Sequence, residues 1–255
     1  MNYYCQNDYK AVPYPHRSRP GATVASSGCG VCCVSMVVEG LTGRSFPPGE
    51  SAVMAIKWGA RAATGTDMGV LSRRIASHFD LKCRKTSNTG EVVKAAKGGA
   101  WAIANVSGDR PGYTALLSSG GHYVAVRGVE GRRLILLDPG YYPGKFSKPG
   151  RRGRAVLRGH DILVTPDTLE LDCFGRSPRY YIFEREDDMT QERFDAMMED
   201  YLARRASRPA SPFAQEALRR AQELGVTDGL RPGGFASREE AVVMIMRALE
   251  LAGKE

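Results

Sequence analysis

The sequence predicts an α+β domain followed by a small all-α unit, and three observations lead to this prediction. Apolar residues recur with helical spacing in the first hundred residues. Segments rich in β-branched and aromatic residues then follow, separated by Gly, Pro and Asp, and the residues after about 190 are helical in pattern again. We therefore expect an α+β domain over residues 1–186, a helix and linker over 187–210, and a helical module over 211–255.

Composition excludes several classes of protein. The chain has 255 residues, of which 42% are hydrophobic and 25% charged, and these are ordinary globular values. No run of about 18 apolar residues is present, so we expect no membrane helix. The N-terminus, MNYYCQNDYK, has no apolar core, so we expect no signal peptide and synthesis in the cytoplasm. Six cysteines are too sparse for a disulfide scaffold.

The first elements along the chain are helical. Residues 1–28 show no sustained period and indicate an extended arm with turns. A helix is expected from Cys29 to Leu41, capped by Ser26 or Ser27 and ended at Gly43. Its apolar face is formed by Cys33, Val34, Val37, Val38 and Leu41. Further helices are expected over residues 68–79 and 91–97.

Strands dominate the middle of the chain. They are expected over residues 101–106, 122–129, 132–138 and 179–184. Glu130-Gly131 predicts a tight hairpin between the second and the third of them. Helices first and a hairpin-rich sheet after favour an antiparallel sheet.

The tail has its own pattern. One helical stripe is formed by Phe194, Met197, Met198, Tyr201 and Leu202. Residues 206–212 are typical of a linker. At its end, Ser211 is expected to cap a helix that has Pro212 at its first position and ends at Gly225. Residues 237–240 (SREE) form a capping box before a last helix, which is expected to end at Gly253. That helix is expected to bury Val242, Ile245 and Leu249. A unit of about 40 residues rarely folds without a partner or a repeat.

Charge is unevenly distributed between the two parts. Residues 190–255 carry 10 basic and 11 acidic side chains, whereas the residues before them carry 26 basic and 17 acidic ones. A basic body can favour an anionic partner, such as an acidic wall polymer or a nucleic acid, although we expect no nucleic acid here. The densest basic cluster lies among Pro and Gly and is interpreted as a solvated loop, with an anion site as the alternative. It consists of Lys145, Lys148, Arg151, Arg152, Arg154 and Arg158.

Cys29 is the first candidate for chemistry. It lies in a Gly-Cys-Gly segment at the expected start of a helix, where unpaired N–H groups and the helix dipole lower the pKa of a thiol. Gly28 and Gly30 are expected to leave the sulfur uncrowded. The spacing to Cys32 also fits a redox pair or half a zinc site. Neither is favoured, because a strand before the pair and a second Cys or His pair are missing, so we expect no metal and no cofactor.

A cysteine nucleophile needs an imidazole partner. The candidates are His16, His78, His122 and His160. His122 opens one expected strand and Asp138 closes the next, so a hairpin brings both to the same end. A carboxylate there can orient the imidazole. His160 remains the reserve candidate.

Four segments in this order resemble the C39-like branch of the papain-like cysteine peptidases. They are residues 4–9 (YCQNDY), 23–30 (TVASSGCG), 120–126 (GGHYVAV) and 136–139 (LLDP). The resemblance covers about residues 3–185 and implies a papain-like fold with Cys29 as nucleophile, His122 as base and Asp138 as orienting carboxylate. It also implies that Gln6 and the Cys29 backbone N–H form the oxyanion hole.

The tail resembles one S-layer-homology repeat. The similar segments are residues 225–229 (GVTDG), Arg231-Pro232, Phe235 and residues 237–240. Such repeats often hold cell-wall polymers. A peptidase joined to such a repeat is expected to act on a peptide, in particular on the peptide bridges of peptidoglycan. The protein would reach them after its release from the cell, as lysins do. The alternatives are a cell-wall amidase with the same Cys–His chemistry and a papain-fold binding protein without turnover.

Overall fold

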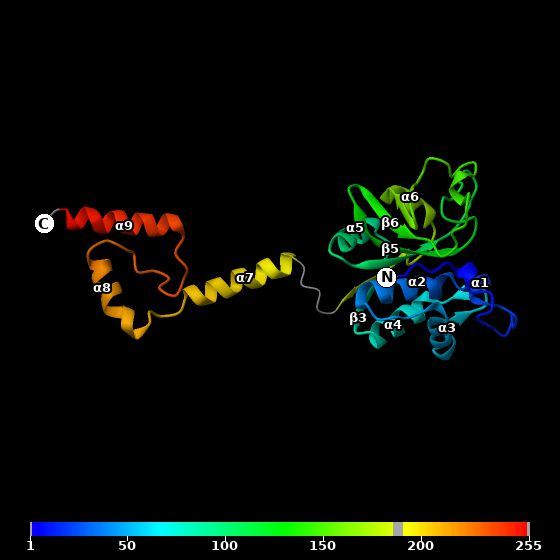
Figure 1. Cartoon of the computed structure of the whole chain (residues 1–255), viewed down its shortest axis with the longest axis horizontal. Coiled ribbons are helices and arrows are strands. Elements are labelled where there is room, and N and C mark those ends of the chain that lie inside the picture. The colour runs from blue at the N-terminus through cyan, green and yellow to red at the C-terminus, as the bar shows by residue number, and fades with distance from the viewer. Residues whose placement is uncertain (1, 186–190, 254–255) are drawn as a thin grey trace. The chain divides into compact units, whose positions relative to one another are not determined.

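The computed structural model describes residues 2–185 and 191–253, and the chain divides into two compact units, Met1–Asp188 and Met189–Glu255 (Figure 1). We call them the body and the tail unit and describe each by itself. The domain boundary expected at residue 186 lies outside the described residues.

The body is organised around a seven-stranded sheet in which every neighbouring pair is antiparallel. The strand order is β3-β9-β4-β5-β6-β8-β7. The strands are β3 (Leu81–Thr86), β4 (Trp101–Val106), β5 (His122–Glu130), β6 (Arg133–Leu137), β7 (Val156–Arg158), β8 (Asp161–Val164) and β9 (Tyr180–Arg185), with a separate pair β1 (Arg61–Ala62) and β2 (Gly65–Thr66).

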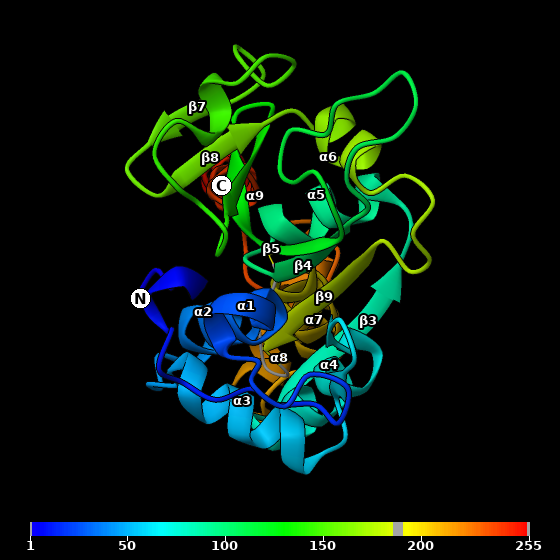
Figure 2. The ribbon, with the colours of Figure 1, turned by 90° about the vertical axis from the view of Figure 1, so that its right-hand side faces the viewer.

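Helices cover both faces of this sheet (Figure 2). The body contains α1 (Val24–Ser27), α2 (Cys29–Thr42), α3 (Pro48–Lys57), α4 (Met68–His78), α5 (Thr89–Lys97) and α6 (Pro166–Asp172), and the short 3-10 helices η1 (Gln6–Asp8) and η2 (Lys145–Ser147). Alternate residues of β4 point to opposite faces, so Trp101 and Ile103 pack with α2, whereas Ala102 and Ala104 pack with α5. The result is two hydrophobic cores, one on each side of the sheet.

This arrangement confirms the predicted α+β class. A long helix that begins at Cys29 packs against an antiparallel sheet, and that sheet carries His122 and leads into Asp138, as in a papain-like fold. The expected helix over 29–41 is α2, which ends at Gly43 with the left-handed φ of 70° that glycine adopts easily. The expected hairpin is also present, with Glu130 paired to Arg133 across the turn.

Some local predictions were wrong. Ser26 and Ser27 do not cap α2, because both lie in the separate helix α1, whose own N-cap is Thr23. The N-cap of α2 is Gly28. Helices α3 and α6 were missed, as was strand β3. Its sequence, LKCRKT, is mostly polar because β3 lies at one edge of the sheet, where only Leu81 is buried.

The tail unit consists of helices joined by loops. They are α7 (Gln191–Ala206), η3 (Pro212–Ala214), α8 (Gln215–Glu223) and α9 (Arg238–Ala252). The predicted capping box is present, because Ser237 Oγ accepts from Glu240 N at 3.0 Å and the Glu240 carboxylate accepts from Ser237 N at 2.7 Å. Ser211 is the N-cap of η3 and Pro212 its first residue, as expected, but Ser211 makes no side-chain cap hydrogen bond.

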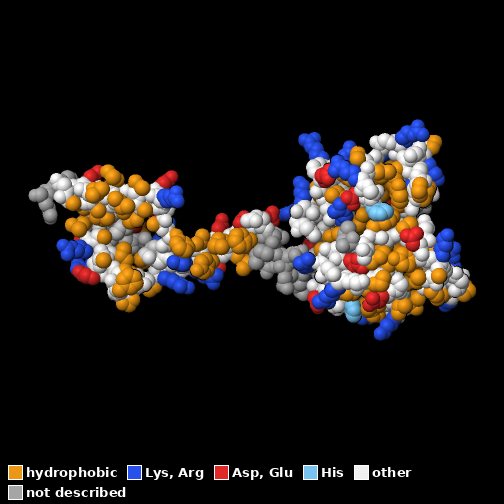
Figure 3. All heavy atoms as spheres, in the orientation of Figure 1, with side chains coloured by type: hydrophobic (Ala, Val, Ile, Leu, Met, Phe, Trp, Pro, Cys, Tyr) orange, Lys and Arg blue, Asp and Glu red, His pale blue; other side chains and the backbone are white. Residues whose placement is uncertain are grey.

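The apolar side of α9 is not buried as predicted. Val242, Ile245 and Leu249 are 58–60% exposed. No described residue of the tail unit is buried, and hydrophobic side chains are plainly visible over its surface in Figure 3. Within residues 2–185 and 191–253, no helix has the length and apolar character needed to cross a membrane.

Candidate active site

Cys29 is the first residue of α2 and follows the N-cap Gly28. The helix dipole and the free N–H groups of the first turn therefore act on its sulfur. The glycines on either side of Cys29 are also needed for packing. A Cβ at Gly30 would lie 2.7 Å from Thr66 Cβ and one at Gly28 would lie 2.5 Å from Val24 O, so the tight packing of the backbone requires both glycines.

His122 and Asp138 meet as the sequence predicts. His122 is the first residue of β5, and Asp138 directly follows the antiparallel neighbour β6. His122 Nε2 lies 2.7 Å from Asp138 Oδ1. The other ring nitrogen, Nδ1, is thereby left for the thiol of Cys29, with which His122 is hydrogen bonded.

The Asp138 carboxylate is fully buried and has a partner on each oxygen. Besides His122, its Oδ1 accepts from the backbone N–H of Gly140 at 2.8 Å. Its Oδ2 is paired with the ammonium of Lys145. The backbone carbonyl of Asp138 accepts from Tyr3 Oη at 2.6 Å. These contacts fix the orientation of the carboxylate that holds the imidazole ring.

Electrostatics favour a thiolate–imidazolium pair. Burial alone would raise the pKa of the Cys29 thiol, but the hydrogen bond and charge of His122, with the backbone N–H groups of Tyr123 and Gly30, lower it below its ordinary value. Burial alone would lower the pKa of His122, but the charge and hydrogen bond of Asp138 raise it to about 9. Burial would raise the pKa of Asp138, yet His122 and Lys145 lower it. All three groups are therefore favoured in their charged forms.

The neighbouring cysteines are different in character. Cys32 and Cys33 lie in the hydrophobic core, where burial and the charge of Cys29 raise the pKa of both thiols well above the ordinary value. Both thiols are free, as is Cys29. Cys29 is only partly buried. Of the three, Cys29 alone combines access with a lowered pKa.

Gln6 lies in η1 and forms hydrogen bonds with the segment after Asp138 and with the helix before Cys29. Its backbone N–H donates to Pro139 O at 2.8 Å, next to Asp138. Its side-chain nitrogen donates to Ala25 O at 2.8 Å, in the helix that precedes Cys29. A primary amide nitrogen has two N–H donors, so one remains for a substrate oxygen. The side-chain oxygen of Gln6 is buried and makes no hydrogen bond.

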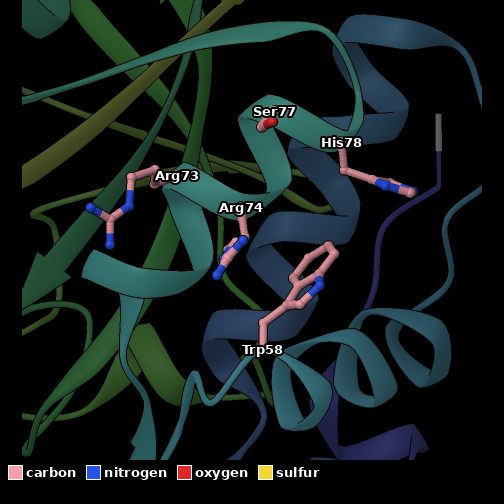
Figure 4. Close-up of a pocket in the computed structure, with 5 residues that line it drawn as sticks. All are labelled: Trp58, Arg73, Arg74, Ser77 and His78. Carbon is pink, nitrogen blue, oxygen red and sulfur yellow. The ribbon is translucent and has the colours of Figure 1, made fainter.

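The other histidines have different surroundings. His16 Nδ1 lies 2.7 Å from Ser18 Oγ in the arm, and the ring of His160 stacks on Tyr3 at 4.0 Å between centroids. His78 lines an open pocket of about 410 Å³, where it meets Trp58 edge to face (Figure 4). Arg73, Arg74 and Ser77 complete the lining. None of these three histidines contacts Cys29 within the part of the chain described.

The basic cluster is only in part the solvated loop that was expected, because Lys148, Arg152 and Arg158 are exposed. Lys145 and Arg151 are buried, and Arg151 Nε donates to Ala115 O at 2.9 Å. Arg154 donates to Gly150 O and to the hydroxyl of Tyr113. Arg158 pairs with Glu130. Lys145, Arg151 and Arg154 therefore make contacts within the body.

Three contributors to the site were not predicted: Tyr3, Gly140 and Lys145. Their signal in sequence is weak, because a tyrosine in an arm, a glycine after Asp-Pro and a lysine in a basic cluster each have ordinary alternatives. A Cβ at Gly140 would lie 2.9 Å from His122 Cε1, so a glycine is needed where the turn passes the ring. Among residues 2–185 and 191–253, no group of three His, Cys, Asp or Glu side chains could hold a metal ion.

No protein-family model and no curated protein sequence matches the chain. Among solved structures, it is similar to the peptidase domain of Streptococcus ComA, a bi-functional ABC transporter involved in a quorum-sensing pathway. That domain is 12% identical, with a TM-score of 0.41 over 62% of this chain and 91% of the other. A Bacillus anthracis protein described as a C39-like peptidase is also 12% identical, with a TM-score of 0.42 over 72% of this chain and 98% of the other. At this sequence identity and these TM-scores, no activity can be assigned to the chain from the similarity.

Proposed function

We propose that the body is a cysteine peptidase that hydrolyses amide bonds through Cys29, His122 and Asp138. The observation that supports it most is the chain of contacts from the Cys29 thiol to His122 and from His122 Nε2 to the buried Asp138 Oδ1. A nucleophile, a base and an orienting group joined in this order are what amide hydrolysis through a covalent intermediate needs.

The proposed reaction begins with attack of the Cys29 thiolate on an amide carbonyl carbon. The oxyanion that forms accepts from the second N–H of Gln6 and the backbone N–H of Cys29, an interaction typically worth about 3–4 kcal/mol. The His122 imidazolium then gives its proton to the departing amine, which leaves a thioester. Water attacks the thioester with His122 as base and releases the acid, and the thiolate–imidazolium pair is restored.

For the substrate, we propose the peptide bridges of peptidoglycan, met at a bacterial cell wall after the chain is released. Two features support this. The tail unit is similar in sequence to an S-layer-homology repeat, and the body carries 26 basic against 17 acidic side chains, which favours an anionic surface. The tail unit also contains a groove of about 740 Å³ lined by apolar side chains and by charged ones such as Arg231 and Glu240.

The test of hydrolysis is digestion of purified cell walls by the full chain, followed by mass spectrometry of the soluble fragments. Matched variants are Cys29→Ala and His122→Ala, which should release nothing. New peptide amino termini within the bridges support the proposed substrate. Cleavage between sugar and peptide indicates an amidase instead. If Cys29 is reactive but neither walls nor soluble peptides are cut, a binding protein with a papain-like fold is the better description.

The test of wall binding is a chain ended at residue 188, since both hydrophobic cores lie before that point. It should keep the thiol reactivity of Cys29 but sediment less with intact walls than the full chain. The comparison is made at moderate and at high salt, because ionic attraction between the basic body and the wall weakens as salt rises. Equal sedimentation of both chains at both salt concentrations would exclude the tail unit as a wall anchor.

A further inference from the structure

Lys145 differs from an ordinary surface lysine. Its side chain is 4% exposed, in η2, and lies beside the rings of Tyr142 and Phe146. Its ammonium pairs with Asp138 Oδ2 and donates to Gly140 O at 3.1 Å. A buried ammonium needs such partners, since leaving one unpaired is strongly unfavourable. Both partners of Lys145 belong to the turn that holds the His122 ring.

Arg151 provides the internal comparison. It belongs to the same basic cluster and is also buried, at 7% exposed. Its Nε donates to a backbone carbonyl, Ala115 O, and it makes no ion pair with an acid in the described part of the chain. A buried cation in this loop therefore does not necessarily contact the active site. Lys145 does contact it, through Asp138 and Gly140.

We propose that Lys145 is a positioning residue that acts on His122 through Asp138. By holding Oδ2, it leaves Oδ1 directed at His122 Nε2. Its positive charge also offsets part of the negative charge of Asp138, so that the imidazolium remains acidic enough to protonate the departing amine. This inference rests on the proposed function, because it concerns the proton that His122 delivers.

The direction of the effect follows from the charges around the ring. The titratable groups that act on His122 and Asp138 are Cys29 and Cys33 from α2, Tyr3 from the N-terminal segment and Lys145 from η2, and Tyr123 of β5 acts on Cys29. Lys145 is the cation among them besides His122 itself. Without it, the carboxylate acts on the imidazolium unopposed, and the pKa values of both His122 and the Cys29 thiol rise.

The experiment measures alkylation of Cys29 in the full chain by iodoacetate from about pH 4 to 10, with the modified cysteine identified by mass spectrometry. An anionic reagent is chosen because its rate rises as the thiolate forms and falls as the imidazolium loses its charge. The variants are Lys145→Met, which removes charge and hydrogen bond, and Lys145→Gln, which keeps a donor for Oδ2. Arg151→Met is the matched control for loss of a buried cation from the loop.

We expect both limbs of the profile to move to higher pH by about one unit in Lys145→Met and Lys145→Gln, and to stay in place in Arg151→Met. Thermal melting reports folding separately, and if Lys145→Met does not fold, Lys145→Gln carries the test. Unchanged limbs in a folded Lys145 variant, or an equal shift in Arg151→Met, would overturn the inference and leave the peptidase proposal intact. A wild-type Cys29 that reacts like an ordinary thiol would instead overturn the proposed function and this inference with it.

Discussion

Ile75 in α4 and Ile245 in α9 occupy similar positions in helical apolar patterns, yet 0% of the surface of the first is exposed and 58% of the second. The difference extends to the two units that contain them. The body has a packed core on each side of its sheet, whereas the described part of the tail unit, residues 191–253, has no buried side chain.

The comparison shows what a helical pattern can and cannot say. It identifies side chains that share a face, but burial also needs a surface opposite that face, and in the body the sheet supplies it. Ion pairs differ between the body and the tail unit in the same way as apolar side chains do. The pair of His122 and Asp138 is removed from water, whereas the ion pair of Arg219 and Glu216 in α8 is exposed on both sides and is screened by solvent.

The largest expected effect belongs to the body. Cys29→Ala should lower amide hydrolysis by at least about 10³-fold, because the residues of a catalytic triad act as a unit. Its melting temperature should stay close to that of the wild type. Cys33→Ala is the matched control and should do the reverse, with activity retained and about 1–2 kcal/mol of stability lost from the core. Full activity in Cys29→Ala would place the chemistry elsewhere.

The two isoleucines test the comparison itself. Ile75→Ala should cost about 2–5 kcal/mol because it leaves a cavity in the core. Ile245→Ala should change the transition by no more than about 0.5 kcal/mol, as surface substitutions do. Urea unfolding followed by tryptophan fluorescence reports on the body, because Trp58 and Trp101 are the two tryptophans of the chain. Equal losses in both variants would mean that α9 stabilises the body.

A smaller effect is expected at Gly140, where an added Cβ would meet the His122 ring. Gly140→Ala should lower kcat/KM by about 10- to 100-fold through displacement of the ring, since small errors in position are costly to catalysis. Gly21→Ala is the control, because nothing lies within 4 Å of a Cβ there. If Gly140→Ala is fully active, the ring has more freedom than these distances allow.

The smallest expected effect concerns pH and stability. The raised pKa of His122, about 9, stabilises the fold below about pH 6.5, and this contribution is lost as pH rises toward 9. The lowered pKa of Cys29 acts in the opposite sense, because its contribution grows as pH rises toward the ordinary value of 9. In the wild type the two largely cancel, so stability should change little between about pH 6.5 and 9.

Cys29→Ala removes one side of this balance. Its unfolding free energy should therefore fall as pH rises through that window, by about 1–2 kcal/mol. Urea unfolding at several pH values measures it in both proteins. The same slope in wild type and variant would mean that the thiol and the imidazole are not linked.

Much of the fold and of the candidate active site could be predicted from the sequence. Strand β4 was located to the residue, because it is a nearly continuous apolar run and both its faces are buried. Cys29, His122 and Asp138 could be found because each lies at the end of an element, where backbone geometry fixes the place of the side chain. The hairpin then determines that His122 and Asp138 are neighbours.

The remainder depends on contacts between distant segments. Nothing local distinguishes Lys145 from Lys148, and only the fold shows that one is buried against Asp138 while the other lies on the surface. Tyr3 donates a hydrogen bond to the backbone of Asp138, from which it is separated by 135 positions in the sequence. The exposure of Ile245 was missed for the converse reason, since the pattern of α9 cannot show that no surface formed by residues 191–253 covers it.

Limited alkylation of the native full chain tests the central claim most directly. Iodoacetamide is added below one equivalent at about pH 6.5, and the modified cysteine is identified by peptide mass spectrometry. We expect Cys29 to be modified first, because His122 lowers the pKa of its thiol while burial raises the pKa of Cys83 to about 11 and that of Cys173 to about 12. In His122→Ala this preference should disappear. Label distributed among the other cysteines in the wild type, or a preference for Cys29 that persists without His122, would contradict a thiolate–imidazolium pair.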